Sequence, residues 1–130
     1  MTRRLRAVAA ILAGAFVSAA VLAPVALRAQ EPGQQLYVVT HVDLAGPNAA
    51  AEGTKLLEEF ATDSRKDKGS VRFELLREVS RLNHLTMVQV WQTRADFEAH
   101  QAAAHTRMFR EKIQPLLGGP LDERLHIILP

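Results

Sequence analysis

The order of predicted strands and helices is the feature that most restricts how this chain can fold. From residue 36 onward, four segments are rich in β-branched and apolar residues, with alternation typical of strands. Stretches with apolar residues at helical spacing follow the first and third of them. The predicted order is strand, helix, strand, strand, helix, strand. We place the strands at 36–44, 70–79, 84–92 and 121–129, and the helices at about 47–66 and, in two pieces, about 93–117.

This order is that of the ferredoxin-like βαββαβ motif, so we predict an α+β domain with a four-stranded antiparallel sheet and helices on one face. Both faces of the predicted strands carry apolar residues. Val38 and Val42 share one face while Val39 lies on the other, and Met87 and Val88 are divided in the same way. Helices on one side would leave the second apolar face exposed, and such patches usually mark an interface. The sequence therefore predicts a homodimer joined through sheet faces, with a ligand cavity between sheet and helices.

The first 29 residues have the composition of an export signal. Three arginines near the start precede an apolar, uncharged run at 7–27, and a polar stretch at 30–35 follows. This layout is typical of a secretory signal peptide that ends near Ala29. An uncleaved anchor is the alternative, because the run is about long enough to span a bilayer. We predict a signal peptide at 1–29, a flexible leader at 30–35 and a domain at 36–130 that is periplasmic or secreted and free of the membrane after cleavage.

Charge and composition exclude several classes of function. The chain has 16 Lys and Arg against 14 Asp and Glu, but four of the basic residues lie in the expected signal. The expected mature domain therefore has 12 against 14, a net charge of −2, and offers no basic excess for nucleic acid. The chain has no cysteine, which excludes thiolate metal sites, iron–sulfur clusters and cysteine nucleophiles.

The segment that runs from the third strand into the next helix carries the most specific pattern. Trp91 ends the predicted strand, His100 follows nine residues later, and His105 comes five residues further on, before an aromatic residue. The second strand adds an aromatic-Glu-apolar stretch at 73–75. In these residues the chain resembles the antibiotic-biosynthesis monooxygenase domain, particularly its quinol-monooxygenase-like branch, over residues 35–129.

The resemblance implies a dimeric α+β barrel and an enzyme that oxygenates electron-rich phenols, quinols or anthrones without metal or flavin. A deprotonated aromatic of this kind can itself pass an electron to oxygen, so the protein must supply an apolar slot, a base and donors for the developing phenolate. The chain also departs from the family. Met87 and Phe97 stand where its anthrone oxygenases have Asn and Tyr, and the stretch 39–41 lacks the Asn of haem-degrading relatives.

The expected site combines two histidines with an aromatic wall. His100, on the apolar side of its helix, and His41, on the first strand, are the candidate catalytic bases, because the ordinary pKa of histidine lies near neutrality. A structural histidine is the alternative for each, as a core or interface residue is for Trp91. We expect these three residues to border one apolar cavity. The expected substrate-binding residues are Trp91, Phe97, His105, Arg72 and Glu74, of which the last two share a strand face where an ion pair is the alternative.

No metal or cofactor is expected. On an unbroken helix His100 and His105 would point about 140° apart, which is poor geometry for one metal ion. The sequence has no HExxH, GxGxxG or P-loop motif. The predicted function is a cofactor-independent monooxygenase that acts on a small electron-rich aromatic of the quinol or anthrone type. The alternative is a non-catalytic dimeric barrel that binds a small hydrophobic ligand, or haem, in the cell envelope.

Overall fold

The computed structural model describes residues 33–130, so the expected signal peptide lies outside the described residues. The elements alternate in the order expected from the sequence. They are β1 (Leu36–Asp43), α1 (Pro47–Ser64), β2 (Ser70–Arg77), β3 (His84–Trp91), α2 (Arg94–Ala102), α3 (Ala104–Ile113), a 3₁₀ turn η1 (Gln114–Leu116) and β4 (Asp122–His126).

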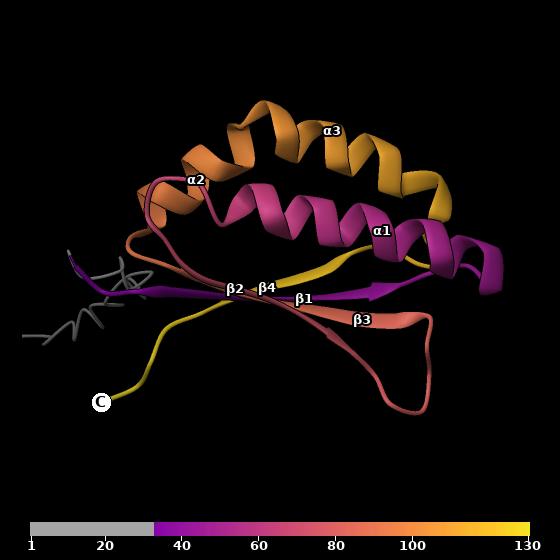
Figure 1. Ribbon diagram of the computed structural model, residues 1–130. Helices are drawn as coiled ribbons and strands as arrows, with labels where there is room; N and C mark the ends of the chain where they lie inside the picture. The colour runs from indigo at the N-terminus through magenta and orange to yellow at the C-terminus, as the bar shows by residue number, and fades with distance from the viewer. Residues whose placement is uncertain (1–32) are drawn as a thin grey trace, which may run out of the picture.

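The four strands form one sheet in the order β2-β3-β1-β4, and all neighbours are antiparallel. β1 pairs with β3 along its whole length, from Leu36 opposite Trp91 to Asp43 opposite His84. The helices lie together on one face of this sheet (Figure 1). Among the described residues, none of the helices has the length and apolarity needed to cross a membrane. The predicted ferredoxin-like α+β fold is therefore confirmed.

Two strand ends differ by more than one residue from those predicted from the alternation in the sequence. β2 ends at Arg77 and β4 at His126, two and three residues earlier than predicted. Val79 is therefore 98% exposed in the β2–β3 connection and does not join the apolar face of its strand. Val71 lies at an irregularity in the pairing of β2 with β3 and is also exposed. An alternating pattern indicates which side chains can share a face, whereas the partner strand decides where pairing stops.

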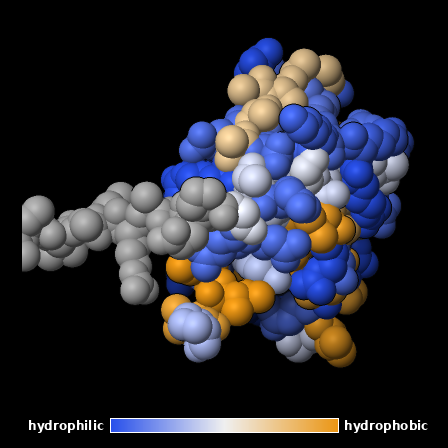
Figure 2. Space-filling view, turned by 90° about the vertical axis from the view of Figure 1, so that its left-hand side faces the viewer, coloured by the Kyte–Doolittle hydropathy of each residue, from blue (hydrophilic) through white to orange (hydrophobic). Residues whose placement is uncertain are grey.

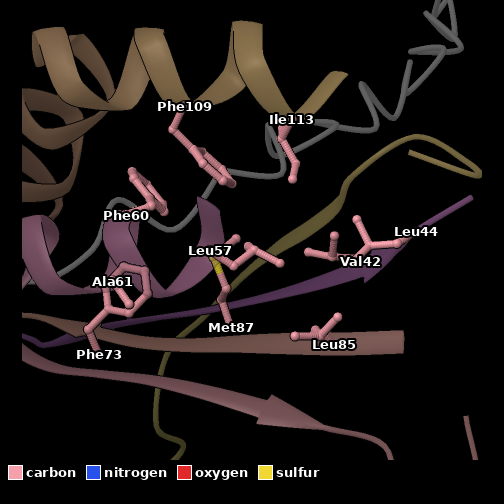
Figure 3. Close-up of a cluster of buried hydrophobic side chains, with 10 residues drawn as sticks. All are labelled: Val42, Leu44, Leu57, Phe60, Ala61, Phe73, Leu85, Met87, Phe109 and Ile113. Atoms are coloured by element: carbon pink, nitrogen blue, oxygen red, sulfur yellow. The ribbon is translucent and has the colours of Figure 1, made fainter. Parts of the chain in front are cut away.

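The main core lies between the sheet and the helices (Figure 3). The Phe60 ring of α1 stacks on Phe109 of α3, with centroids 4.0 Å apart and planes at 6°. The same ring meets Phe73 of β2 edge-on at 5.7 Å. Burial of these side chains is the main stabilising term of the domain. The cluster comprises Val42, Leu44, Leu57, Phe60, Ala61, Phe73, Leu85, Met87, Phe109 and Ile113.

The opposite face of the sheet has no helix over it. Val39 and Val88 are half-buried there, and Leu76 is exposed. The segment after β4 adds three exposed apolar residues at 127–129. Figure 2 shows hydrophobic residues at the surface in its lower half, on the side of the sheet away from the helices. The predicted second apolar face is therefore present, and we call it the open face.

Candidate functional site

The second helical segment is interrupted between the two histidines of the sequence pattern. α2 begins as predicted, because the Thr93 Oγ1 accepts a hydrogen bond from the Asp96 backbone N–H at 3.1 Å and caps the helix. The helix ends at Ala102, and Ala103 has an extended backbone (φ −65°, ψ 148°) before α3 starts. His100 and His105 therefore do not have to point about 140° apart, as they would on an unbroken helix.

Both histidines point at one carboxylate, that of Asp67. The Nδ1 atom of His100 lies 2.7 Å from Asp67 Oδ2, and Nε2 of His105 lies 3.0 Å from the same oxygen. The second pair lacks the alignment of a hydrogen bond, and Nε2 of His105 is buried with no hydrogen-bond partner among residues 33–130. One potential ligand atom from each of Asp67, His100 and His105 lies within 4.8 Å of the other two. We call these three residues the Asp-His-His cluster.

Asp67 does not stand out in the sequence as a site residue. It lies in the turn that joins α1 to β2, among charged residues that are typical of any helix end. Its position could be inferred only from the pairing of Ser70, at the start of β2, with Trp91. That pairing brings the turn close to α2, whose last turn carries His100, 33 residues further along the chain than Asp67.

Gly69 fixes the turn that carries Asp67. Its φ of 78° lies in the left-handed region, which costs other residues about 1–2 kcal/mol. A Cβ atom there would also lie 2.3 Å from Cγ of Asp96. The Gly69 carbonyl accepts a hydrogen bond from the Gln92 N–H at 2.8 Å. Glycine at this position therefore allows the turn to pack closely against the entry of α2.

We expect Gly69→Ala to lower the free energy of unfolding by about 2–3 kcal/mol, because backbone strain adds to the displacement of Asp96. Urea denaturation measures the change. Gly119→Ala is the matched control, since its added Cβ meets nothing within 4 Å and should change stability by less than about 0.5 kcal/mol. Equal midpoints for the two variants would contradict this account of the turn.

His100 is the buried member of the cluster, with a side chain that is 1% exposed. Its ring lies 4.6 Å from that of Trp91 and 5.5 Å from that of Phe60, centroid to centroid. Burial lowers the pKa of His100 below its ordinary value, although the hydrogen bond and charge of Asp67 oppose the shift. In the neutral form, Nδ1–H is the donor that suits the carboxylate, which leaves Nε2 as the acceptor.

Trp91 and Phe97 belong to the packing around His100. Trp91 is 0% exposed, and its indole Nε1–H donates to Oε1 of Gln89 at 2.9 Å. Phe97 is buried as well, with its ring centroid 6.2 Å from that of Trp91. Together with Leu36 and Val38 they form a second small core. In this conformation Trp91 has no surface free for a substrate, which favours its core role.

The other expected site residues lie on the open face, so the sheet separates them from His100. His41 is exposed there, with Nδ1 3.2 Å from Oγ1 of Thr86. Arg72 and Glu74 are half-exposed on the same face, 3.8 Å apart from Nε to Oε2. The expected cavity shared by Trp91, His100 and His41 is therefore not formed. Strand alternation turns His41 away because Thr40 and Val42 point at the helices.

Two of the hollows beside α1 lie toward its two ends. The smaller has a volume of about 140 Å³ and lies beside the Asp-His-His cluster, where Phe60, His105 and Phe109 form part of its wall. The larger, of about 570 Å³, lies at the beginning of α1 and is mostly apolar. Its one charged lining residue, Arg77, donates from Nη2 to Oγ1 of Thr54 at 3.0 Å. Of these two hollows, the smaller is the one lined by a histidine.

Several solved structures have the same fold. PA3566 from Pseudomonas aeruginosa is 21% identical, with a TM-score of 0.69, over 75% of this chain and 96% of its own. A protein described as an antibiotic biosynthesis monooxygenase is 19% identical, with a TM-score of 0.69, over 73% and 99%. SnoaB, a cofactor-independent oxygenase from Streptomyces nogalater, is 20% identical, with a TM-score of 0.64, over 72% and 91%. At these identities the likeness establishes the fold.

Family assignment comes from the sequence. None of the curated proteins compared with the chain matches it. The model of the antibiotic biosynthesis monooxygenase family matches residues 36–112, which is more than half of the chain. This range runs from the start of β1 through most of α3 and includes Asp67, His100 and His105. The chain belongs to the antibiotic biosynthesis monooxygenase family.

Proposed function

We propose that this protein is a cofactor-independent monooxygenase that acts on a small electron-rich aromatic compound of the quinol or anthrone type. The observation that carries the proposal is the buried Asp67–His100 pair, packed against Trp91 between sheet and helices. A carboxylate that holds an imidazole by Nδ1 fixes the orientation of the ring and its tautomer. Nε2 of His100 is then the atom that accepts the proton of a substrate hydroxyl or acidic C–H group.

The chemistry needs no further redox partner. Once deprotonated, the aromatic anion donates electrons to O₂ and forms a bond to oxygen. One oxygen atom stays on the oxidised ring carbon, and the other leaves as water. For the conversion of a ring CH₂ group to a carbonyl, the substrate supplies all four electrons. The protein therefore contributes a base, orientation and a site from which water is excluded.

The small hollow beside His105 is the proposed entrance. A planar substrate there would lie against Phe60 and Phe109, whose rings already stack on each other. His105 would meet the substrate first, and His100 lies behind it with the two ring centroids 5.6 Å apart. Because the hollow is small, entry requires movement of side chains on α3. We propose that His105 orients the hydroxyl group while His100 takes the proton.

Oxygen uptake by chelator-treated protein tests this function against a panel of quinols and anthrones. Uptake that depends on protein and substrate, with one oxygen atom of O₂ recovered in the product, is the expected result. Uptake no faster than in protein-free buffer across the panel would contradict it.

The complete burial of Trp91 favours the second candidate, a barrel that only binds a hydrophobic ligand. In that case the same compounds would bind, as measured by calorimetry, without oxygen consumption.

We propose that the working form is a homodimer joined through the open face. Its half-buried Val39 and Val88, together with Leu76, provide the apolar surface that such an interface requires. Sedimentation of the purified protein at micromolar concentration should give twice the monomer mass. Val88→Glu should give the monomer mass, because a carboxylate buried between two sheets without a partner costs several kcal/mol.

Met108→Glu is the control for the dimer. It places the same charge on an exposed apolar residue of α3 in the helix layer and should leave the dimer intact. A wild-type monomer, or equal effects of the two variants, would contradict an interface on the open face.

We also propose that the domain works outside the cytoplasm, as the first 29 residues predict. Recovery of full-length protein from the cytoplasmic fraction of expressing cells would contradict export.

A further inference from the structure

We propose that Asp67, His100 and His105 form a binding site for one divalent first-row transition-metal ion. This goes beyond the proposed function, which uses no metal, and reverses the expectation from the sequence. That expectation depended on an unbroken helix, and the extended backbone at Ala103 removes it. The break turns the two imidazoles toward one carboxylate from two different helices.

The distances suit a shared ion. Zn²⁺ holds nitrogen and oxygen ligands at about 2.0–2.2 Å, so tetrahedral neighbours lie roughly 3.3–3.5 Å apart. Here Asp67 Oδ2 lies 2.7 Å from Nδ1 of His100 and 3.0 Å from Nε2 of His105, and one potential ligand atom from each residue lies within 4.8 Å of the other two. Small rotations of the side chains would place them around one ion. Asp67 lies in a turn, where such adjustment is easier than within a helix.

An unsatisfied atom gives an independent reason to expect a ligand. Nε2 of His105 is buried and has no hydrogen-bond partner within the described part of the chain. A buried polar nitrogen in that state costs about 1–3 kcal/mol, and a metal ion at this point would give it a partner. The ion would also bind Nδ1 of His100 in place of the proton now shared with Asp67.

The ligand set selects the class of ion. Two imidazoles and one carboxylate suit Zn²⁺, Fe²⁺, Co²⁺ or Ni²⁺, whereas Mg²⁺ and Ca²⁺ prefer oxygen ligands. Three protein ligands leave a position open for water or substrate. The hollow beside His105 lies next to the cluster, and its wall also contains Glu59, Asp63 and Lys112. The net charge of these three side chains is negative, which favours a cation.

A second pair of histidine and aspartate provides an internal comparison. The His84 ring contacts the Asp43 carboxylate at the edge of the open face, with the aspartate more than half exposed. Among residues 33–130, the Asp-His-His cluster is the group whose three donor atoms converge closely enough for one ion. Adventitious binding at the surface would therefore depend on His84, whereas binding at the proposed site depends on His105.

Metal binding and the proposed catalysis use the same atoms, so each should exclude the other. A bound ion would take Nδ1 of His100 and the carboxylate of Asp67, and it would fix the imidazole in a different orientation. If the proposed function is correct, Zn²⁺ should inhibit oxygen uptake and a chelator should restore it. Binding itself is measured without any turnover, so the two proposals can fail separately.

The test is a titration of chelator-treated full-length protein, without a histidine tag, by Zn²⁺ in a calorimeter. One ion should bind per chain, and Co²⁺ should give the d–d absorption of a low-coordinate site. Asp67→Asn and His105→Ala should each weaken Zn²⁺ binding by about 100-fold or more, beyond the roughly 10–100-fold loss typical of a supporting partner. His84→Ala and His126→Ala should bind as the wild type does. Circular dichroism confirms that each variant is folded.

Three results would overturn the proposal. The first is the absence of saturable Zn²⁺ binding to the wild type. The second is loss of Zn²⁺ binding in His84→Ala together with normal binding in His105→Ala. The third is displacement of Zn²⁺ by an equal concentration of Mg²⁺. If Asp67→Asn fails to fold, the Zn²⁺ affinity of His105→Ala alone tests the proposal. We expect this variant to fold, because the His105 side chain is partly exposed and packs at the edge of the core. Oxygen uptake by metal-free protein together with no Zn²⁺ binding would leave the proposed function standing and remove only the metal site.

Discussion

Replacing His100 by alanine should lower turnover per folded molecule by about 100-fold or more, the usual size of a lost general base. The reason is geometric, because Nε2 of His100 is the proposed proton acceptor and Asp67 holds the ring through Nδ1 at 2.7 Å. Asp67→Asn should act in the same direction, on the order of 100-fold, because an amide can present its N–H group to Nδ1 and favour the other tautomer. Oxygen uptake at saturating quinol measures both effects.

The competing explanation is that His100 is only structural. Its ring fills space between Trp91 and Phe60, so His100→Ala should also lower the melting temperature. A structural histidine would give that loss of stability with nearly normal turnover per folded molecule. Asp67→Asn separates the two roles, because it keeps the shape of the cluster and leaves both rings in place. Normal turnover in the folded Asn variant would contradict a catalytic Asp67–His100 pair.

The largest loss of stability is expected for Trp91→Ala, at about 3–5 kcal/mol. The side chain is fully buried, contacts the rings of His100 and Phe97, and donates to Gln89. Trp91→Phe should cost less, about 1–3 kcal/mol, chiefly because Oε1 of Gln89 loses its buried donor. Urea denaturation followed by circular dichroism measures both changes.

Val79→Ala is the control for the tryptophan variants, since Val79 is 98% exposed and should change stability by less than about 0.5 kcal/mol. Turnover of Trp91→Phe distinguishes a core residue from a substrate wall. A core residue should leave turnover per folded molecule within a few-fold of the wild type. A large rise in KM at normal stability would show instead that the indole contacts substrate, and it would require a more open conformation of the site.

Local patterns in the sequence were sufficient for the order of elements and for the two faces of the sheet. Alternation in β1 placed Val38 and Val42 on one face of the sheet and His41 on the other, and the burial of the two valines agrees with this division. The predicted helix start near residue 93 agrees with the structure, because Thr93 caps α2 through a local contact with Asp96, three residues further on. Strand ends were predicted less well, since the extent of pairing in β2 depends on β3 rather than on β2 itself.

The site required the tertiary structure. Alternation left open which face of the sheet the helices cover, and so whether His41 could approach His100. The contact of His100 with Asp67 joins residues that are 33 positions apart. No local sequence pattern links a histidine to an aspartate at that separation. The site depends on the turn at Gly69 and on the break at Ala103, which redirects His105.

The sequence by itself determined the class of fold, the family and three candidate histidines, His41, His100 and His105, because these depend on periodicity and spacing within short segments. Only the tertiary structure decided that Asp67 joins the last two of these histidines, that Trp91 is buried and that His41, Arg72 and Glu74 lie across the sheet. The physical reason is that the partners, burial and pKa of a side chain are set by the residues that pack around it. Those residues can lie far away in the sequence, so local sequence patterns do not identify them.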